Sequence, residues 1–251
     1  MKGLLRTLSL SFLAISTHSV ASKVNYYVIA DQARPFQIEQ QGKQHSGIVT
    51  DIINAIFAES DYDVKYHTYP FKRMISVLEA GGEENWVTYG SPNWGKVQSE
   101  NLSTLPIYTV KHVLVSSSKA PFKFSDMQHM QGRSIVLLLG FDYPNLSPFF
   151  ENGTVNEMRV KDYNAAYRVL QRTPGDTAFV EMESRVVYNI KRLELPMENF
   201  QIQSFSAVIP DYPIYLAFSP KMNPKVQSFI NKRLAELKSS GKIDDIIKKY
   251  I

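Results

Sequence analysis

The 251-residue sequence contains no cysteine. This absence excludes disulfide bonds, a thiolate nucleophile and a zinc site with cysteine ligands. It also excludes a lipid-modified cysteine, so no lipid anchor is expected. The chain must therefore be stabilised by its apolar cores, and its length is sufficient for one large or two modest cores.

Long hydrophobic runs are also missing after the N-terminus. Apolar stretches such as 135–140 and 215–218 have the length of a strand, whereas a transmembrane helix needs about 20 residues. We therefore expect no stable insertion into a membrane.

The N-terminus, residues 1–21, has the three parts of a secretory signal. A short basic head precedes an apolar run at 8–15, and small residues end at Ala21, after which we predict cleavage. The alternative, a buried N-terminal helix, is disfavoured because His18 and the serines interrupt any apolar stripe. The mature protein is expected to be free in the periplasm.

Charge of either sign is not in excess. The chain has 28 basic and 24 acidic residues, and loss of Lys2 and Arg6 with the signal leaves 26 against 24. This balance argues against a nucleic-acid partner, which would require a basic stripe. The five histidines show no metal-ligand spacing, and Gly-x-Ser-x-Gly and His-Glu-x-x-His are missing. We therefore expect no metal, no cofactor and no enzymatic activity.

The hydrophobic pattern predicts alternating strands and helices. In the first part of the chain, strands are expected at 24–30, 64–69 and 86–89, with helices at 48–57 and 73–78. This order implies parallel strands joined by crossover helices.

A second unit of the same kind is predicted from about residue 112. Because it repeats the alternation, we expect an α/β protein with two lobes of similar size. Its expected strands lie at 112–116, 135–139 and 177–180, its helices at 125–131, 164–171 and 182–193, and the C-terminal helices at 224–238 and 244–250.

Seven short segments follow one another along the mature chain: Ala30-Asp31, Pro35-Phe36, 46–52, 104–108, 126–135, 175–181 and 230–243. No single segment is specific, but their order is. In this order they resemble the family-3 periplasmic solute-binding proteins, the polar amino-acid receptors of ABC importers.

The resemblance implies the type II periplasmic-binding-protein fold, in which a two-segment hinge joins two α/β lobes around a ligand cleft. Lobe one would comprise 22–110 plus 213–251, and lobe two 111–212. Two crossings form a hinge that permits closure around a ligand. The implied function is binding of a small polar or cationic, amino-acid-like solute by a monomer that delivers it to an ABC transporter permease.

The family's usual carboxylate clamp is missing from this sequence. Its amino-acid receptors use the arginine of a Thr-x-x-Arg segment, whose guanidinium suits a carboxylate. Counted from Asn85, those two positions fall on Trp94 and Val97. Phe141 also stands where the family often has threonine or serine. Both departures argue against ordinary α-amino-acid binding.

Two charged residues remain as ligand-binding candidates. Glu181 occupies the position of the family's amino-group-binding aspartate and would pair a ligand cation; alternatively, it is an exposed glutamate at a strand end. Arg73 begins a predicted helix, where a cation opposes the macrodipole, so it is a candidate for an anion in the cleft. Its alternative role is a salt bridge to Glu79 or Asp51.

Aromatic residues complete the candidate site. Phe71 stands where the family stacks an aromatic ring on its ligand, and aromatic rings hold planar groups or cations. Core packing is the alternative role for each. The predicted ligand-binding set is Phe71, Arg73, Tyr89, Trp94, Phe141, Tyr143 and Glu181.

Two other functions are compatible with the same fold. One alternative is a ligand-sensing module that acts through a membrane partner, and the other is a small-metabolite lyase. The sequence does not identify the ligand.

Overall fold

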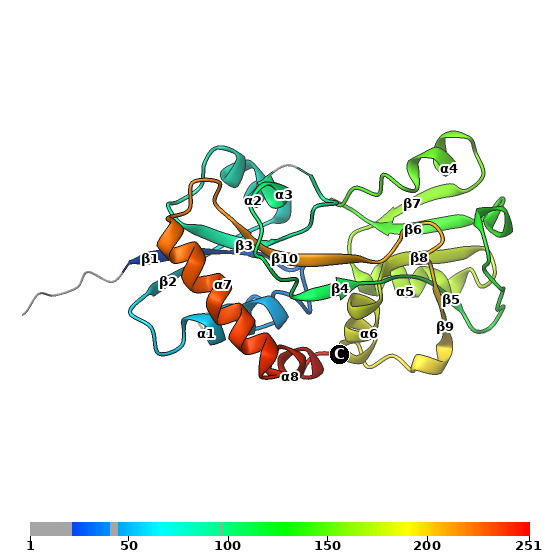
Figure 1. The fold of residues 1–251 in the computed structure, drawn as a ribbon. Coiled ribbons are helices and arrows are strands. Elements are labelled where there is room, and N and C mark those ends of the chain that lie inside the picture. The colour runs from blue at the N-terminus through cyan, green and yellow to red at the C-terminus, as the bar shows by residue number, and fades with distance from the viewer. Residues whose placement is uncertain (1–21, 41–44, 96) are drawn as a thin grey trace, which may run out of the picture.

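The computed structural model describes residues 22–40, 45–95 and 97–251. Two five-stranded sheets, each covered by helices, form two lobes (Figure 1). The predicted two-lobed α/β fold is confirmed. The predicted export signal lies outside the described residues.

The first sheet has the strand order β2-β1-β3-β10-β4. β1 pairs in parallel with both β2 and β3, as the predicted crossovers require, and β10 is antiparallel to β3 and β4. The strands are β1 (Lys23–Ile29), β2 (Asp63–Tyr69), β3 (Trp86–Gly90), β4 (Tyr108–Val110) and β10 (Tyr212–Phe218), and the helices are α1 (Ile48–Phe57), α2 (Phe71–Glu79), α3 (Val97–Glu100), α7 (Pro224–Ser239) and α8 (Lys242–Lys248).

The second sheet has the order β7-β6-β8-β5-β9. β6 is parallel to β7 and β8, whereas β5 is antiparallel to β8 and β9. The strands are β5 (His112–Ser117), β6 (Ser134–Leu138), β7 (Asn156–Val160), β8 (Thr177–Met182) and β9 (Phe200–Ser204); the helices are α4 (Ser147–Glu151), α5 (Tyr163–Arg172) and α6 (Glu183–Arg192), with 3₁₀ turns at Met127–Met130 and Met197–Asn199.

The short helix expected at 125–131 is a single 3₁₀ turn. The Asp126 carboxylate caps it by accepting hydrogen bonds from the backbone N–H groups of Gln128 and His129. Gly132 follows with φ of 76°, a left-handed conformation that glycine adopts without steric cost.

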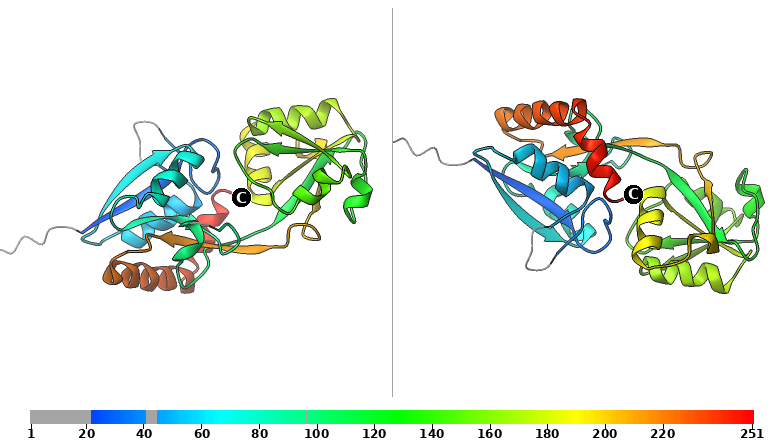
Figure 2. Two further views of the ribbon diagram at one scale, coloured as in Figure 1. Left: turned by 90° about the horizontal axis from the view of Figure 1, so that it is seen from above. Right: turned by 90° about the horizontal axis from the view of Figure 1, so that it is seen from below.

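The chain crosses between the lobes twice. The first crossing, at Lys111, separates β4 from β5, and the second is the segment 205–211 between β9 and β10. Figure 2 shows the two lobes side by side, connected by these segments. The backbone N–H of Phe205 donates to the carbonyl of His112 at 2.9 Å, so the two crossings are tied together at the start of lobe two.

The core follows from the alternation of side chains along the strands. Val113 and Val115 of β5 pack toward α5 and α6, in a cluster confined to lobe two. Leu114, between them, belongs to a larger cluster that continues into lobe one. This continuous apolar packing joins the facing parts of the lobes.

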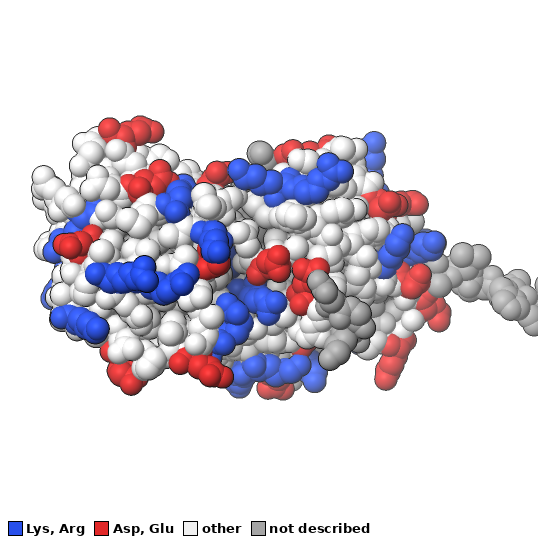
Figure 3. All heavy atoms as spheres, turned by 180° about the vertical axis from the view of Figure 1, so that it is seen from behind, with Lys and Arg blue, Asp and Glu red and all other residues white. Residues whose placement is uncertain are grey.

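Within the described ranges, no helix is both long and apolar enough to cross a membrane. On the face shown in Figure 3, basic and acidic side chains are interspersed, without a continuous basic stripe.

Candidate ligand-binding site

Aromatic rings from both lobes meet around one arginine. Phe71 of α2 stacks on Phe141, which follows β6, with ring centroids 5.4 Å apart. The guanidinium carbon of Arg185, from α6, lies 5.2 Å from the centroid of the Phe141 ring and 5.9 Å from that of Phe36. The guanidinium of lobe two is therefore flanked by one ring from each lobe.

The aromatic cluster continues toward the hinge. Phe36 stacks on Tyr89 at 5.8 Å, and Tyr89 meets Trp94 edge to face at 5.5 Å. The Trp94 indole Nε1 donates to the Tyr212 hydroxyl at 3.1 Å, and the ring of Tyr212 lies 5.7 Å from that of His112. The cluster thus extends from α2 to both hinge crossings.

Four predicted site residues therefore lie in one interlobe cluster: Phe71, Tyr89, Trp94 and Phe141. Their role in ligand binding stays a prediction. Because both lobes contribute rings to this continuous cluster, the four residues are placed where a ligand between the lobes could contact them.

Glu181 occupies the end of β8, where alternation turns it toward α5. It is 3% exposed. Its Oε2 accepts from the Tyr163 hydroxyl at 3.1 Å, and its Oε1 accepts from the backbone N–H of Met182 at 2.8 Å. Both carboxylate oxygens are therefore engaged by the protein itself. The alternative of an exposed strand-end glutamate is wrong.

Arg185 is the charge partner of Glu181. α6 begins directly after β8, and a long side chain in its first turn extends back toward the helix N-terminus. The distance from Arg185 Nη1 to Glu181 Oε1 is 3.7 Å, which is an ion-pair contact but too long for a hydrogen bond. The guanidinium is thus neutralised, and its Nε has no hydrogen-bond partner among the described residues.

Four buried polar atoms in this region have no partner at ordinary hydrogen-bond geometry among the described residues. They are Arg185 Nε, Tyr89 OH, His112 Nδ1 and Ser184 Oγ. Roughly 90% or more of buried polar groups in folded proteins are paired. The concentration of four unpaired atoms around one lobe contact is typical of a site built to bind a polar ligand.

The charge of Arg185 affects the pKa values of the neighbouring Tyr89 and His112. Burial raises the pKa of Tyr89, and Arg185 acts in the opposite direction. Burial lowers the pKa of His112 to about 4, and Arg185 contributes to this decrease. His112 is therefore neutral at neutral pH.

Arg185 itself stays cationic. Burial favours its neutral form, but electrostatic interactions with Tyr163 and with the Glu181 carboxylate outweigh this effect and raise its pKa above the ordinary value. The site therefore combines one permanent cation, one compensating carboxylate and several neutral hydroxyl and imidazole groups.

Tyr143 lies at the edge of the same cluster. Burial raises its pKa, and the charges of Glu181 and Arg185 act on it in opposite directions. The guanidinium carbon of Arg159 lies 5.1 Å from its ring centroid. Tyr143 is therefore close enough to the charged pair to interact with it electrostatically.

Arg73 lies apart from this cluster. It is exposed on the first turn of α2. Asp51, one of its two expected partners, is instead contacted by Lys249 Nζ at 2.6 Å and by the Tyr250 hydroxyl at 2.9 Å. The buried arginine at the contact between the lobes is Arg185, which the sequence interpretation missed.

The signal that singled out Arg73 also applies to Arg185. Both are arginines in the first turn of a helix, where the macrodipole disfavours a cation. Arg185 has a second signal, the four-residue spacing from Glu181. His112, Phe36 and Tyr163 gave no comparable signal, because each resembles an ordinary core residue in the sequence.

A pocket of about 460 Å³ opens between the lobes beside this cluster. Both lobes line this pocket, and one of its lining residues is Tyr163, whose hydroxyl donates to Glu181. The lining residues are Ala30, Asp31, Gln32, Arg34 and Pro70 from lobe one, and Leu138, Lys161, Asp162, Tyr163, Asn189 and Arg192 from lobe two.

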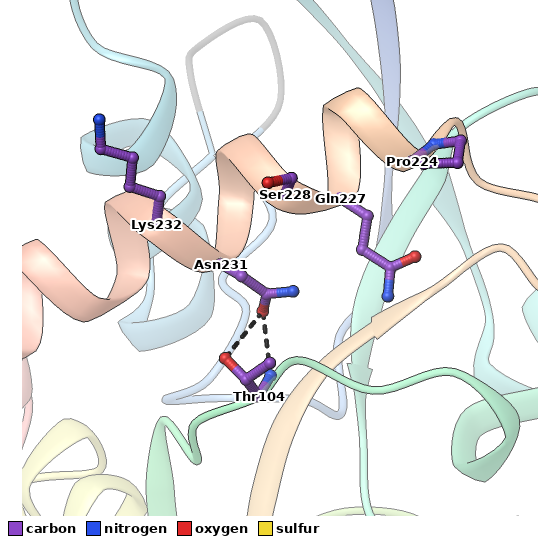
Figure 4. A pocket seen from close by; sticks show the side chains of 6 residues that line it. All are labelled: Thr104, Pro224, Gln227, Ser228, Asn231 and Lys232. Atoms are coloured by element: carbon purple, nitrogen blue, oxygen red, sulfur yellow. Dashed lines mark hydrogen bonds between the residues drawn. The ribbon is translucent and has the colours of Figure 1, made fainter.

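A second hollow, of about 570 Å³, lies on lobe one alone. Figure 4 shows its lining residues, most of them on α7. Asn231 Oδ1 accepts hydrogen bonds from the backbone N–H of Thr104 at 2.9 Å and from its hydroxyl at 3.3 Å. These contacts fasten α7 to the chain before β4, so the polar groups serve packing within the lobe.

Two curated relatives resemble this chain over most of its length. PatH, a protein of Vibrio harveyi named for binding to an amino-acid ABC transporter, is 22% identical over 86% of this chain and 84% of its own. A protein of Campylobacter jejuni named for histidine binding is 22% identical over 88% of this chain and 82% of its own.

Solved structures share the fold. One, described in connection with glutathione import and the cystine ABC importer of Streptococcus mutans, is 23% identical with a TM-score of 0.73, and the match covers 92% of this chain and 95% of that one. A histidine kinase sensor domain similar to periplasmic binding proteins matches with a TM-score of 0.69, 16% identity and coverage of 92% and 96%. The family model of bacterial extracellular solute-binding proteins, family 3, matches residues 27–251, and the chain belongs to this family.

Proposed function

We propose that this protein binds a small, polar, amino-acid-like solute between its lobes and delivers it to the permease of an ABC importer. The observation that carries this proposal is the group of buried, unpaired polar atoms at the contact of the two lobes. A ligand that pairs them recovers the free energy that their desolvation costs.

Binding and closure are linked in this arrangement. Phe36 and Tyr89 belong to lobe one, and Phe141 and Arg185 belong to lobe two. A ligand that touches both sets favours the closed arrangement by its differential affinity for that state. A permease that recognises the closed surface would then receive only loaded protein.

The relatives support the transport role. The Vibrio harveyi relative is named as a binding protein of an amino-acid ABC transporter, and the family is one of extracellular solute-binding proteins. We place the mature chain in the periplasm, without a lipid anchor and as a monomer that binds its solute without chemical change.

Calorimetric titration of the purified mature protein tests this function. The panel contains the twenty common L-amino acids, short peptides, amines and small organic acids. We expect saturable binding of at least one amino-acid-like compound, a decrease in the radius of gyration by small-angle scattering, and recovery of the compound unchanged. Failure of every compound to bind would contradict the proposal, and conversion of a bound compound would indicate a lyase.

A sensing role is the second candidate, favoured by the likeness to a histidine kinase sensor domain. The fold is shared, so the partner distinguishes the two functions. Crosslinking of the ligand-loaded protein to membranes of its own cell, followed by identification of the captured protein, separates them. Capture of a permease supports import, and capture of a kinase or receptor supports sensing.

A further inference from the structure

We propose that Arg185 binds a carboxylate of the ligand, and that Glu181 holds this arginine in position rather than binding a ligand cation. The inference rests on the proposed function, because it assigns the chemistry of the same interlobe site. It defines the ligand class as small organic carboxylates.

The guanidinium of Arg185 has the donors for this role. The residue is 4% exposed, and its Nε has no hydrogen-bond partner among the described residues. Its Nη1 stands 3.7 Å from Glu181, beyond hydrogen-bond distance. Phe36 and Phe141, its ring neighbours, offer no strong acceptor. A planar guanidinium whose Nε is unpaired can donate to a carboxylate oxygen, and its fork of donors suits the two oxygens of that group.

The neighbouring unpaired groups, like the Arg185 guanidinium, require a hydrogen-bond acceptor on the ligand. The hydroxyls of Tyr89 and Ser184 donate hydrogen bonds, and neutral His112 donates from Nδ1 in one of its tautomers. An acceptor-rich anion satisfies such donors together. An ammonium group could not pair with these donors because it is itself a donor, and the positive charge of Arg185 would repel it.

Glu181 is poorly placed to bind a ligand cation. Both of its oxygens already accept hydrogen bonds, from Tyr163 and from the backbone of Met182. Its nearest charged group is the Arg185 guanidinium. Its negative charge therefore offsets a buried cation and fixes the direction of that side chain, which makes it a positioning residue.

The carboxylate site would couple the lobes. Tyr89 is on β3 of lobe one and Arg185 is on α6 of lobe two, yet the charge of Arg185 affects the pKa of Tyr89. A carboxylate that accepts from both would form hydrogen bonds to both lobes only when they are closed.

The test compares ligands first and variants second. Each L-amino acid that binds the unmodified mature protein is compared with its α-carboxamide and with the amine that lacks the carboxyl group. We expect both derivatives to bind at least about 100-fold more weakly, since hydrogen bonds to charged groups are the strong ones. This comparison needs no variant and cannot fail through misfolding.

The variants then identify the residue. Arg185→Gln should weaken binding about 100-fold or more, and Arg185→Lys should retain part of the affinity through its charge. Arg168→Gln, an exposed arginine of α5, is the matched control and should leave the dissociation constant unchanged. Because Arg185→Gln leaves a buried carboxylate without its partner, Glu181→Gln with Arg185→Gln is the second variant, which restores charge balance and should also bind weakly.

The outcomes separate this inference from the proposed function. Equal binding of the carboxamide, or retention of affinity in the charge-balanced double variant, would overturn the role of Arg185 and leave solute binding intact. Loss of binding in Glu181→Gln or Arg73→Gln, together with full affinity in Arg185→Gln, would assign the ligand to those residues instead. If no compound of the panel binds, the proposed function fails and this inference fails with it.

Discussion

Replacement of Tyr89 by phenylalanine should change stability and affinity in opposite directions. The side chain is 1% exposed, and its hydroxyl has no hydrogen-bond partner among the described residues. An unpaired buried polar group costs about 1–3 kcal/mol, so Tyr89→Phe should raise the ligand-free free energy of unfolding by about 1 kcal/mol. For a chain of this size, that corresponds to an increase of about 2–4 °C in melting temperature.

The same hydroxyl should stabilise the bound ligand. A hydrogen bond to a carboxylate is worth about 1.5–3 kcal/mol, so Tyr89→Phe should raise the dissociation constant by about 10- to 100-fold. Urea unfolding followed by tryptophan fluorescence measures the first effect, and calorimetric titration with the best-binding amino acid measures the second.

Tyr26→Phe is the matched control. The Tyr26 hydroxyl is also buried, but it is paired with Thr50 Oγ1 at 3.0 Å and accepts from Gln37 Nε2 at 2.9 Å. Its removal should lower the free energy of unfolding by about 1 kcal/mol and leave the dissociation constant unchanged. If Tyr89→Phe instead destabilised the ligand-free protein and bound ligand normally, the hydroxyl would be a structural group and its role in ligand binding would be refuted.

Three further predictions concern the same cluster. Glu181→Gln should lower the free energy of unfolding by about 3 kcal/mol, measured in urea, because it leaves the buried Arg185 cation uncompensated. The folded-state pKa of His112 is about 4, below the ordinary value of about 6.5, so the unfolded chain takes up the proton first as pH falls. The free energy of unfolding should therefore decrease by about 3 kcal/mol between pH 6.5 and 4. His112→Gln should flatten this pH profile in urea titrations. Phe71→Ala should weaken ligand binding about tenfold by calorimetry, because it removes the ring that stacks on Phe141 across the cleft.

The regular elements were predictable where burial imposes a clear period. Apolar residues at helical spacing predicted the helix at 48–57, and α1 has those bounds. β7 and β9 were missed for a physical reason: they are the two edge strands of the second sheet, and their residues are largely polar or partly exposed. β4 is also an edge strand of only three residues. Such strands are defined by pairing with a neighbour, which is a long-range interaction.

The site was only partly predictable. The resemblance indicated Phe71, and Tyr89, Trp94 and Phe141 were further aromatic candidates; these four meet in the interlobe cluster. The resemblance did not indicate Arg185, because the positions that correspond to the family's Thr-x-x-Arg segment follow β3, at Trp94 and Val97. The predicted strand also ended at residue 180, whereas β8 continues to Met182. That extension buries Glu181 and places it beside the first turn of α6.

The unpaired polar atoms around Arg185 would make closure of the two lobes depend on the ligand. With the lobes closed, Arg185, Tyr89, His112 and Ser184 are buried with unpaired atoms, and each such atom costs about 1–3 kcal/mol. In an open arrangement, water would pair these groups and remove that cost. A carboxylate that pairs three of them recovers about 3–9 kcal/mol, a range that includes the roughly 5.5 kcal/mol needed to shift a two-state equilibrium from 1:99 to 99:1. The apolar rings alone would close the lobes whether or not a ligand is present. In the proposed binding mode the buried polar atoms oppose that closure, and a carboxylate that pairs them shifts the equilibrium toward the closed state.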